Sequence, residues 1–114
     1  MTFDDIRRIA LKFPGVVDAT SYDTPAIKVG TQFLLRERDP GIVAMRCASI
    51  DDRDLLIETG EDAFFITDHY RDYPYVLIRL ETLDPARFTF LFEAIWRQKA
   101  LQKHLKAYED TRGS

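Results

Sequence analysis

Residue types suited to proton chemistry gather in one loop between two apolar segments. His69 lies within a few residues of Asp68 and Asp72. A histidine beside a carboxylate can be held in one tautomer and act as a general base. However, no nucleophile lies at a spacing that would complete a mechanism, so we expect no enzymatic activity. The alternative for His69 is a structural one, in which its ring hydrogen-bonds the loop backbone and holds a hairpin.

The same loop has the composition of a recognition surface. Tyrosine is enriched in protein interfaces, and this segment contains Tyr70, Tyr73 and Tyr75. We therefore predict His69, Tyr70 and Tyr73 as residues that bind a small ligand or a protein partner.

A second kind of recognition, the binding of nucleic acid, would need a basic stripe beside hairpins or aromatic rings. The candidate cations are Lys28, Arg36 and Arg38 on a predicted hairpin and Arg71 in the loop. A second basic cluster comprises Arg97, Lys99, Lys103 and Lys106. In this hypothesis two hairpin tips flank a helix. The alternative is that these are solubilising charges, because carboxylates interleave with them: Glu37, Asp39 and Asp72.

Metal and thiol chemistry have little support in the sequence. The two histidines, His69 and His104, are far apart, and no Cys/His pair has ligand spacing. The carboxylates of residues 51–62 do not follow a calcium-loop pattern, so we predict a solvated acidic face and neither metal nor cofactor. The single cysteine, Cys47, ends a predicted strand on its core side, where a buried structural thiol is expected.

Composition predicts one domain over residues 1–114. Apolar residues make up 46% of the chain and charged residues 31%, which is typical of a water-soluble folded protein. No apolar segment is long enough for a membrane span, and the first residues lack the pattern of a signal peptide. A lone cysteine is in keeping with the cytoplasm. The net charge is −3, but it is unevenly distributed: residues 48–68 are acidic, and residues 25–47 and 85–108 are basic.

Hydrophobic periodicity and capping residues predict the elements that position these side chains. A helix is expected over residues 2–13, capped by Thr2 and Asp5, with Asp4 pairing with Arg8. Strands are expected at residues 26–29, 32–37 and 42–47, with turns at Gly30-Thr31 and Asp39-Pro40-Gly41.

Further along the chain we expect a short helix, two strands and a long helix. The short helix is capped by Ser49 or Asp51 and ends at Gly60. The strands cover residues 63–67 and 75–80, the second with Val76, Ile78 and Leu80 toward the core. Asp84-Pro85 then opens a single helix to about residue 108. This order predicts an α+β fold, an antiparallel sheet covered on one face by the N- and C-terminal helices.

Three motifs in this order resemble the MmcQ/YjbR-like family over nearly the whole chain. They are Phe13-Pro14-Gly15-Val16, the segment of residues 24–30, and the His69-Tyr70 loop leading into residues 75–80. The resemblance implies a fold like that of CyaY and frataxin. It also implies DNA binding, since the family is described as a "double wing" DNA-binding group. A frataxin-like iron site is not expected, because Asp4 and Asp5 are matched by nearby basic residues.

The sequence therefore predicts a small cytoplasmic binding protein. DNA is the partner implied by the resemblance, and a protein or small ligand bound at the His69 loop is the alternative. No membrane association is expected, and the sequence does not predict an oligomeric state.

Overall fold

The computed structural model describes residues 1–59 and 61–112, without the side chain of residue 112. Its elements, in chain order, are α1 (Phe3–Ala10), β1 (Val16–Ser21), β2 (Thr24–Val29), β3 (Gln32–Asp39), β4 (Ile42–Arg46), α2 (Ile50–Glu58), β5 (Phe64–Phe65), the 3-10 helix η1 (Asp68–Tyr70), β6 (Tyr75–Arg79), the 3-10 helix η2 (Leu80–Thr82), α3 (Pro85–Lys99) and α4 (Gln102–Arg112). None of the helices in these residues is both long and apolar enough to cross a bilayer.

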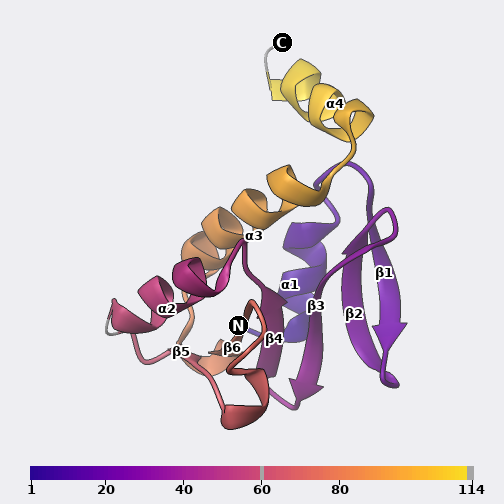
Figure 1. The fold of residues 1–114 in the computed structure, drawn as a ribbon. Helices are drawn as coiled ribbons and strands as arrows, with labels where there is room; N and C mark the ends of the chain where they lie inside the picture. The colour runs from indigo at the N-terminus through magenta and orange to yellow at the C-terminus, as the bar shows by residue number, and fades with distance from the viewer. Residues whose placement is uncertain (60, 113–114) are drawn as a thin grey trace.

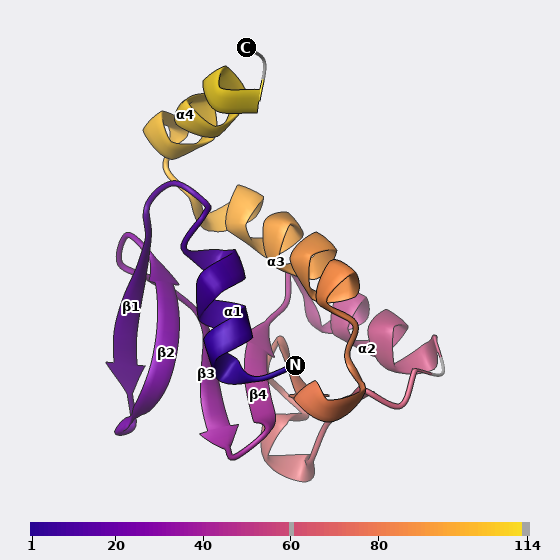
Figure 2. The same cartoon turned by 180° about the vertical axis from the view of Figure 1, so that it is seen from behind.

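The strands form one antiparallel sheet of six strands in the order β1-β2-β3-β4-β6-β5. Helices α1 and α3 lie against one face of this sheet, as the two opposite views in Figures 1 and 2 show. We call this the covered face and the other the open face. The α+β fold with helices on a single face is therefore confirmed.

Strand register assigns each side chain to one of the two faces. Ile27, Leu35, Met45 and Val76 are paired in turn across β2, β3, β4 and β6, and all of them belong to the main core. Directly paired residues point to the same side of a sheet, so this row marks the covered face. The core also contains Ile78 of β6 and Leu80, the first residue of η2, which confirms the inward residues predicted for the strand of residues 75–80.

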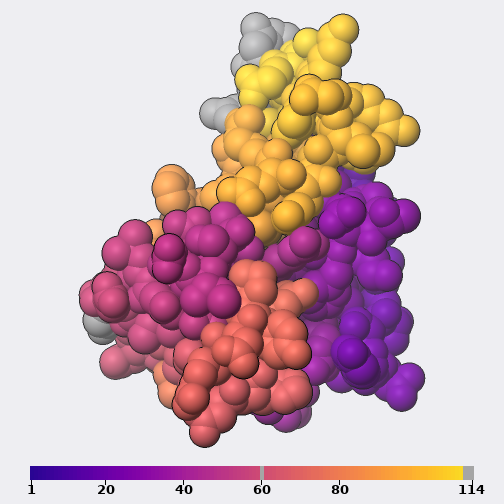
Figure 3. Space-filling model, in the orientation of Figure 1, coloured from indigo at the N-terminus to yellow at the C-terminus, as the bar shows by residue number. Residues whose placement is uncertain are grey.

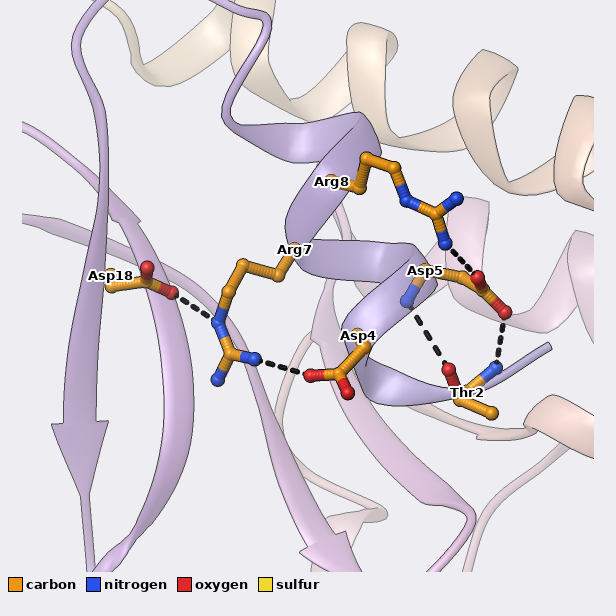
Figure 4. A network of polar contacts seen from close by, with 6 residues as sticks. All are labelled: Thr2, Asp4, Asp5, Arg7, Arg8 and Asp18. Atoms are coloured by element: carbon orange, nitrogen blue, oxygen red, sulfur yellow. Dashed lines mark hydrogen bonds and ion pairs between the residues drawn. The ribbon is translucent and has the colours of Figure 1, made fainter.

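Helix α1 begins with the predicted capping box and is tied to strand β1 (Figure 4). The Thr2 hydroxyl accepts from the Asp5 amide, and the Asp5 carboxylate accepts from the Thr2 amide. The expected Asp4–Arg8 pair is wrong. Arg7 instead bridges Asp4 at 2.6 Å and Asp18 of β1 at 2.8 Å, while Arg8 pairs with Asp5.

Helix α1 is also shorter than predicted, ending at Ala10 instead of continuing to residue 13. The chain then reverses at Gly15, whose φ of 79° lies in the left-handed region that glycine tolerates. Strand β1 follows directly and was not predicted. Its sequence mixes polar and apolar residues without regular alternation, so the sequence gives no strand pattern there. The strand is recognised in the structure by its pairing with β2.

The turns at Gly30-Thr31 and Pro40-Gly41 lie where the sequence places them, since β2 ends at Val29, β3 ends at Asp39 and β4 begins at Ile42. The cap of α2 is Ser49, whose hydroxyl accepts from the Asp52 amide at 3.1 Å. The helix cap at its other end is Thr59. The prediction that Gly60 ends this helix lies outside the described residues. Strand β5 has two residues, fewer than the five expected over 63–67.

The single C-terminal helix predicted to residue 108 is wrong. The chain leaves helical geometry at Ala100 (φ −71°, ψ 149°) and starts α4 at Gln102. This break allows Tyr108 to return to the core, where its ring stacks on Phe13 at 5.3 Å and meets Trp96 at 4.9 Å. An uninterrupted helix rises 1.5 Å per residue and would carry residue 108 away from these rings. Helix α4 stands beyond the end of the sheet (Figure 1).

Candidate functional site

The open face has a floor of small side chains. Residues Ala19, Ala26, Arg36 and Ala44 are paired in turn across β1, β2, β3 and β4, and Leu77 of β6 completes the row. Because these residues share a face, three alanines lie in one row across β1, β2 and β4 on the face that α1 and α3 leave open. The larger side chains on either side therefore enclose a hollow.

All the basic side chains of the strands point to this open face. Lys28 is paired with Phe33, Arg36 with Ala44, Arg46 with Tyr75 and Arg79 with Ile42, each a partner on the open side. Two of the strand carboxylates differ: Asp18 bonds Arg7 of α1, and Glu37 is paired with the core residue Val43. Asp39, at the end of β3, is paired with Ile42 on the open side and forms an ion pair with Arg38. The strand cations are thus concentrated on the open face, although the chain as a whole is acidic.

A β-bulge contributes to this separation. The register between β2 and β3 shifts at Ile27/Lys28, so β3 contains an extra residue opposite β2. Leu34 and Leu35 are consequently both buried in the core, while Phe33 and Arg36 on either side of them lie on the open face. Bulges commonly redirect side chains beside functional surfaces.

The hollow is a groove of about 760 Å³. Its lining consists of Ser21, Tyr22, Lys28, Phe33, Arg36, Ala44, His69, Tyr70, Tyr73 and Tyr75. This lining, drawn from the described residues, contains no carboxylate. Figure 3 shows the same face, with the loop of β5–β6 beside the strands of the N-terminal half. The groove therefore combines aromatic rings with cations.

One rim of the groove is the two-residue turn between β1 and β2. Tyr22 and Asp23 have φ values of 51° and 63°, both in the left-handed region, as in a type I′ hairpin turn. The Tyr22 side chain is 84% exposed, and the Arg36 guanidinium lies 5.0 Å from its ring centre. Arg36 also donates to the Thr24 hydroxyl at 3.3 Å. This cation–π contact fixes the positions of the Tyr22 ring and the Arg36 guanidinium at the edge of the groove.

The opposite rim is the loop of residues 68–74, and a buried arginine holds it. Arg53 of α2 is only 3% exposed. One nitrogen of its guanidinium donates to the backbone carbonyls of Tyr70 at 2.8 Å, Arg71 at 3.1 Å and Tyr73 at 2.8 Å. The other side of the guanidinium pairs with Asp54 at 2.8 Å. A charged donor satisfies several carbonyls at once, which fixes the loop against the sheet.

His69 is not the residue that holds this loop. Its side chain is exposed, meets the edge of the Tyr70 ring at 5.1 Å and makes no hydrogen bond among the described residues. Tyr70 itself is buried against Ala44 and Leu77, with the Arg38 guanidinium 5.4 Å from its ring centre. The structural role expected for His69 therefore belongs to Arg53.

The two sets of residues predicted from the sequence meet in this one groove. Lys28 and Arg36 from the predicted basic set line it together with His69, Tyr70 and Tyr73 from the predicted ligand set. Arg38 lies beside the groove over Tyr70 and pairs with Asp39 at 3.5 Å. Arg71 is outside the lining and pairs with Asp68 at 2.9 Å.

The second basic cluster and the expected arrangement of wings are not part of this site. The β1–β2 turn and the 68–74 loop flank the open sheet face, whereas α1 and α3 lie on the other face (Figures 1 and 2). Arg97 is held by Glu93 at 3.0 Å and Glu109 at 3.1 Å, and these hydrogen bonds raise its pKa. The expected arrangement of a helix between two hairpin tips stays a prediction.

Cys47 is buried in the core, as predicted, and lacks the setting of a nucleophile. Loss of solvent around the thiol raises its pKa to about 12. No group of His, Cys, Asp or Glu side chains that could hold a metal occurs in the described residues. An acidic segment does precede the loop, but the buried Arg53 lies within it.

Three residues of the site were missed by sequence reasoning. Tyr22 precedes Asp23 in a turn that has no glycine, Phe33 lies at a bulge, and Arg53 lies among carboxylates of a short helix. Only Arg53 had a usable signal, since its position faces the core if the helix is drawn from Ser49.

Comparison with known proteins places the fold. One solved structure superposes with a TM-score of 0.69 over 93% of this chain and 86% of that chain, at 16% sequence identity. It is the crystal structure of protein DR2400 from Deinococcus radiodurans, a DUF419 domain. This is a likeness of fold. The scan of family models gives no match, and neither does the search of curated proteins.

Proposed function

We propose that this protein is a cytoplasmic, non-enzymatic member of the MmcQ/YjbR-like family that binds nucleic acid, DNA in the first instance, through the groove of the open face. The observation that supports this most is the concentration of strand cations on the open face of the sheet. Lys28, Arg36, Arg46 and Arg79 point to the open face and form no ion pair among the described residues. Phosphates would be the natural counterions for such a surface.

Family resemblance and fold support the same proposal. The three motifs that resemble the MmcQ/YjbR-like proteins include the segment containing Lys28 and the loop containing His69. The superposition on a DUF419 domain is in keeping with that family. In the proposal the "wings" are the β1–β2 turn and the 68–74 loop, and the surface between them is a sheet.

A protein or small-molecule ligand is the second candidate, and the concave shape of the site favours it. Ligand pockets commonly have volumes of this order and are lined by aromatic side chains with a few polar groups. In this alternative Tyr70 and Tyr73 would make the main contacts and the cations would be secondary. Catalysis has less support, since no carboxylate contacts the His69 ring within the described residues and nothing orients it as a base.

The test is fluorescence anisotropy with a labelled DNA oligonucleotide at increasing salt. The double variant Lys28→Gln/Arg36→Gln removes two cations from the groove. The control variant Lys103→Gln/Lys106→Gln removes two cations from α4, far from the groove. If Lys28 and Arg36 each contact a phosphate, the slope of log K against log salt should become shallower by about 1.4–1.8 in the groove variant only.

Equal losses in both variants would mean that binding follows net charge alone and would overturn the proposed site. No binding by the wild-type protein at 20 mM salt would overturn the function. Circular dichroism of each variant confirms that it is folded. Should binding of DNA be absent, a thermal-shift screen of metabolites that stabilises the wild type but not Tyr73→Ala would support the second candidate.

A further inference from the structure

We propose that the groove accepts unpaired bases, so that the protein prefers a single strand to a duplex. This inference rests on the proposed nucleic-acid function and specifies its ligand. The groove has the components that single-strand-binding surfaces use, which are stacking rings next to a cationic track. Both components, the rings and the cations, are present among the described residues.

The aromatic rings are available for stacking. Tyr22 on one rim is 84% exposed and Tyr73 on the other is 55% exposed. Between them, Phe33 and Tyr75 lie 6.0 Å apart and Tyr75 and Tyr70 lie 6.3 Å apart, as ring-centre distances with an edge contact. A continuous aromatic wall thus runs from the strands to the loop. It can contact any base, because every base has a π face.

The cations lie where phosphates of a bound strand would pass. Lys28 and Arg36 line the groove itself, and Arg38 lies over Tyr70 at its side. Arg46 shares the open face, where it donates to the Gln32 side chain at 3.2 Å and the Phe33 carbonyl at 3.3 Å. Positive charge and aromatic rings therefore alternate along the same face.

A duplex would use this surface poorly. Reading a duplex requires a helix or a two-stranded ribbon that projects into the major groove. Here α1 and α3 cover the other face of the sheet, and the site is a concavity whose lining includes Ala44 and the surrounding rings. Paired, stacked bases cannot lay their faces on rings that line a concavity, whereas a single strand can turn its bases outward.

The backbone of Tyr22 provides independent support. A tyrosine in the left-handed region is uncommon, and type I′ turns prefer Asn, Asp or Gly at this position. Strained residues of this kind cluster at ligand-binding sites. The strained turn presents an exposed ring next to Arg36, which is the arrangement that stacking on a base would need.

The experiment compares three probes of equal length by anisotropy at 50 mM salt: labelled dT12, its duplex with dA12 and an abasic 12-mer. We expect dT12 to bind at least 10-fold more tightly than the duplex. The abasic strand keeps the phosphates and should lose most of that preference. Duplex binding equal to or tighter than dT12 would overturn the inference while leaving the proposed function intact.

Variants then locate the contact. Tyr22→Asn and Tyr73→Ala should each weaken dT12 binding by about 5- to 100-fold, since one base stack is lost, and should change duplex binding little. The matched control is Phe90→Ala, which removes an exposed aromatic ring (68% exposed) from α3 on the other side of the sheet. Tyr22→Asn suits the turn and should fold normally. An unchanged affinity of folded Tyr22→Asn and Tyr73→Ala for dT12 would also overturn the inference.

Discussion

The two faces of the sheet are formed by the same strands but differ in what their side chains contact. On the covered face, Phe92 and Trp96 of α3 are fully buried, and the charge at its edge is paired, as in the Arg7–Asp18 contact. On the open face the middle row is alanine, and cations stand beside exposed rings. The covered face contributes most of the free energy of folding. The open face leaves exposed aromatic rings, and cations without ion-pair partners among the described residues, available to a ligand.

This contrast predicts that mutations on the covered face change stability and leave the intrinsic affinity of the folded protein unchanged. The largest effect is expected for Trp96→Ala. Trp96 is fully buried, packs on Phe13 at 5.2 Å and donates to the Pro14 carbonyl at 2.9 Å. Its removal should lower the free energy of unfolding by about 3–5 kcal/mol, measured by urea denaturation.

Arg53 joins the two faces, and its replacement should affect both properties. Arg53→Met keeps the length of the side chain but leaves the carbonyls of Tyr70 and Tyr73 without their charged donor. We expect a loss of about 2–4 kcal/mol in the free energy of unfolding. The loop should also exchange its amide hydrogens faster. An unchanged exchange rate for residues 70–73 would mean that the loop is held by other contacts.

Because the thiol of Cys47 is buried on the covered face, the stability of the protein should depend on pH. Its folded-state pKa of about 12 is higher than the value of about 8.5 expected in the unfolded chain. The folded state therefore binds the proton more tightly, and this contribution to stability is complete below pH 8 and decreases as pH rises from about 8.5 toward 12. The difference in stability between wild type and Cys47→Ala, measured from pH 8 to 10.5, should follow this decrease. Rapid reaction of the native thiol with an alkylating reagent at pH 8 would contradict it.

The smallest expected effect has the opposite sign. Tyr22→Asn relieves a left-handed conformation that costs on the order of 1 kcal/mol and loses an exposed cation–π contact worth about 0.5 kcal/mol. The variant should therefore be more stable than wild type by about 0.5 kcal/mol. A higher melting temperature of Tyr22→Asn together with weaker binding of dT12 would show that wild-type Tyr22 favours binding at the expense of the stability of the protein. A lower melting temperature would indicate that Tyr22 stabilises the turn itself.

Local signals were sufficient for much of the fold. The Thr2 cap, the Pro40-Gly41 turn and the Asp84 cap are set by neighbouring residues, and they lie where the sequence predicts them. The break at Ala100 could not be predicted, because neither glycine nor proline marks it. It depends on contacts of Tyr108 with Phe13 and Trp96, which are distant in sequence.

Several residues of the candidate site were predictable, but their meeting in one groove was not. The basic hairpin and the tyrosine loop were separate hypotheses, each with its own ligand. Only the strand order, which places β4 beside β3 and β6 beside β4, brings Arg36 and Tyr75 to one face. Arg53 was missed although its position on the helix faces the core, because an arginine among acidic residues in a helix usually faces water.

The contact between Arg7 and Asp18 has a consequence beyond attaching α1 to the sheet. Strand β1 is at the edge of the sheet, so one side of its backbone has no neighbouring strand. Such an edge is a template on which another molecule can add a strand and begin aggregation. A charged side chain directed toward the covered face makes β1 a poor template, because an added strand would have to accommodate the ion pair. We therefore expect the same contact to oppose the addition of a further strand at this edge when the protein is concentrated.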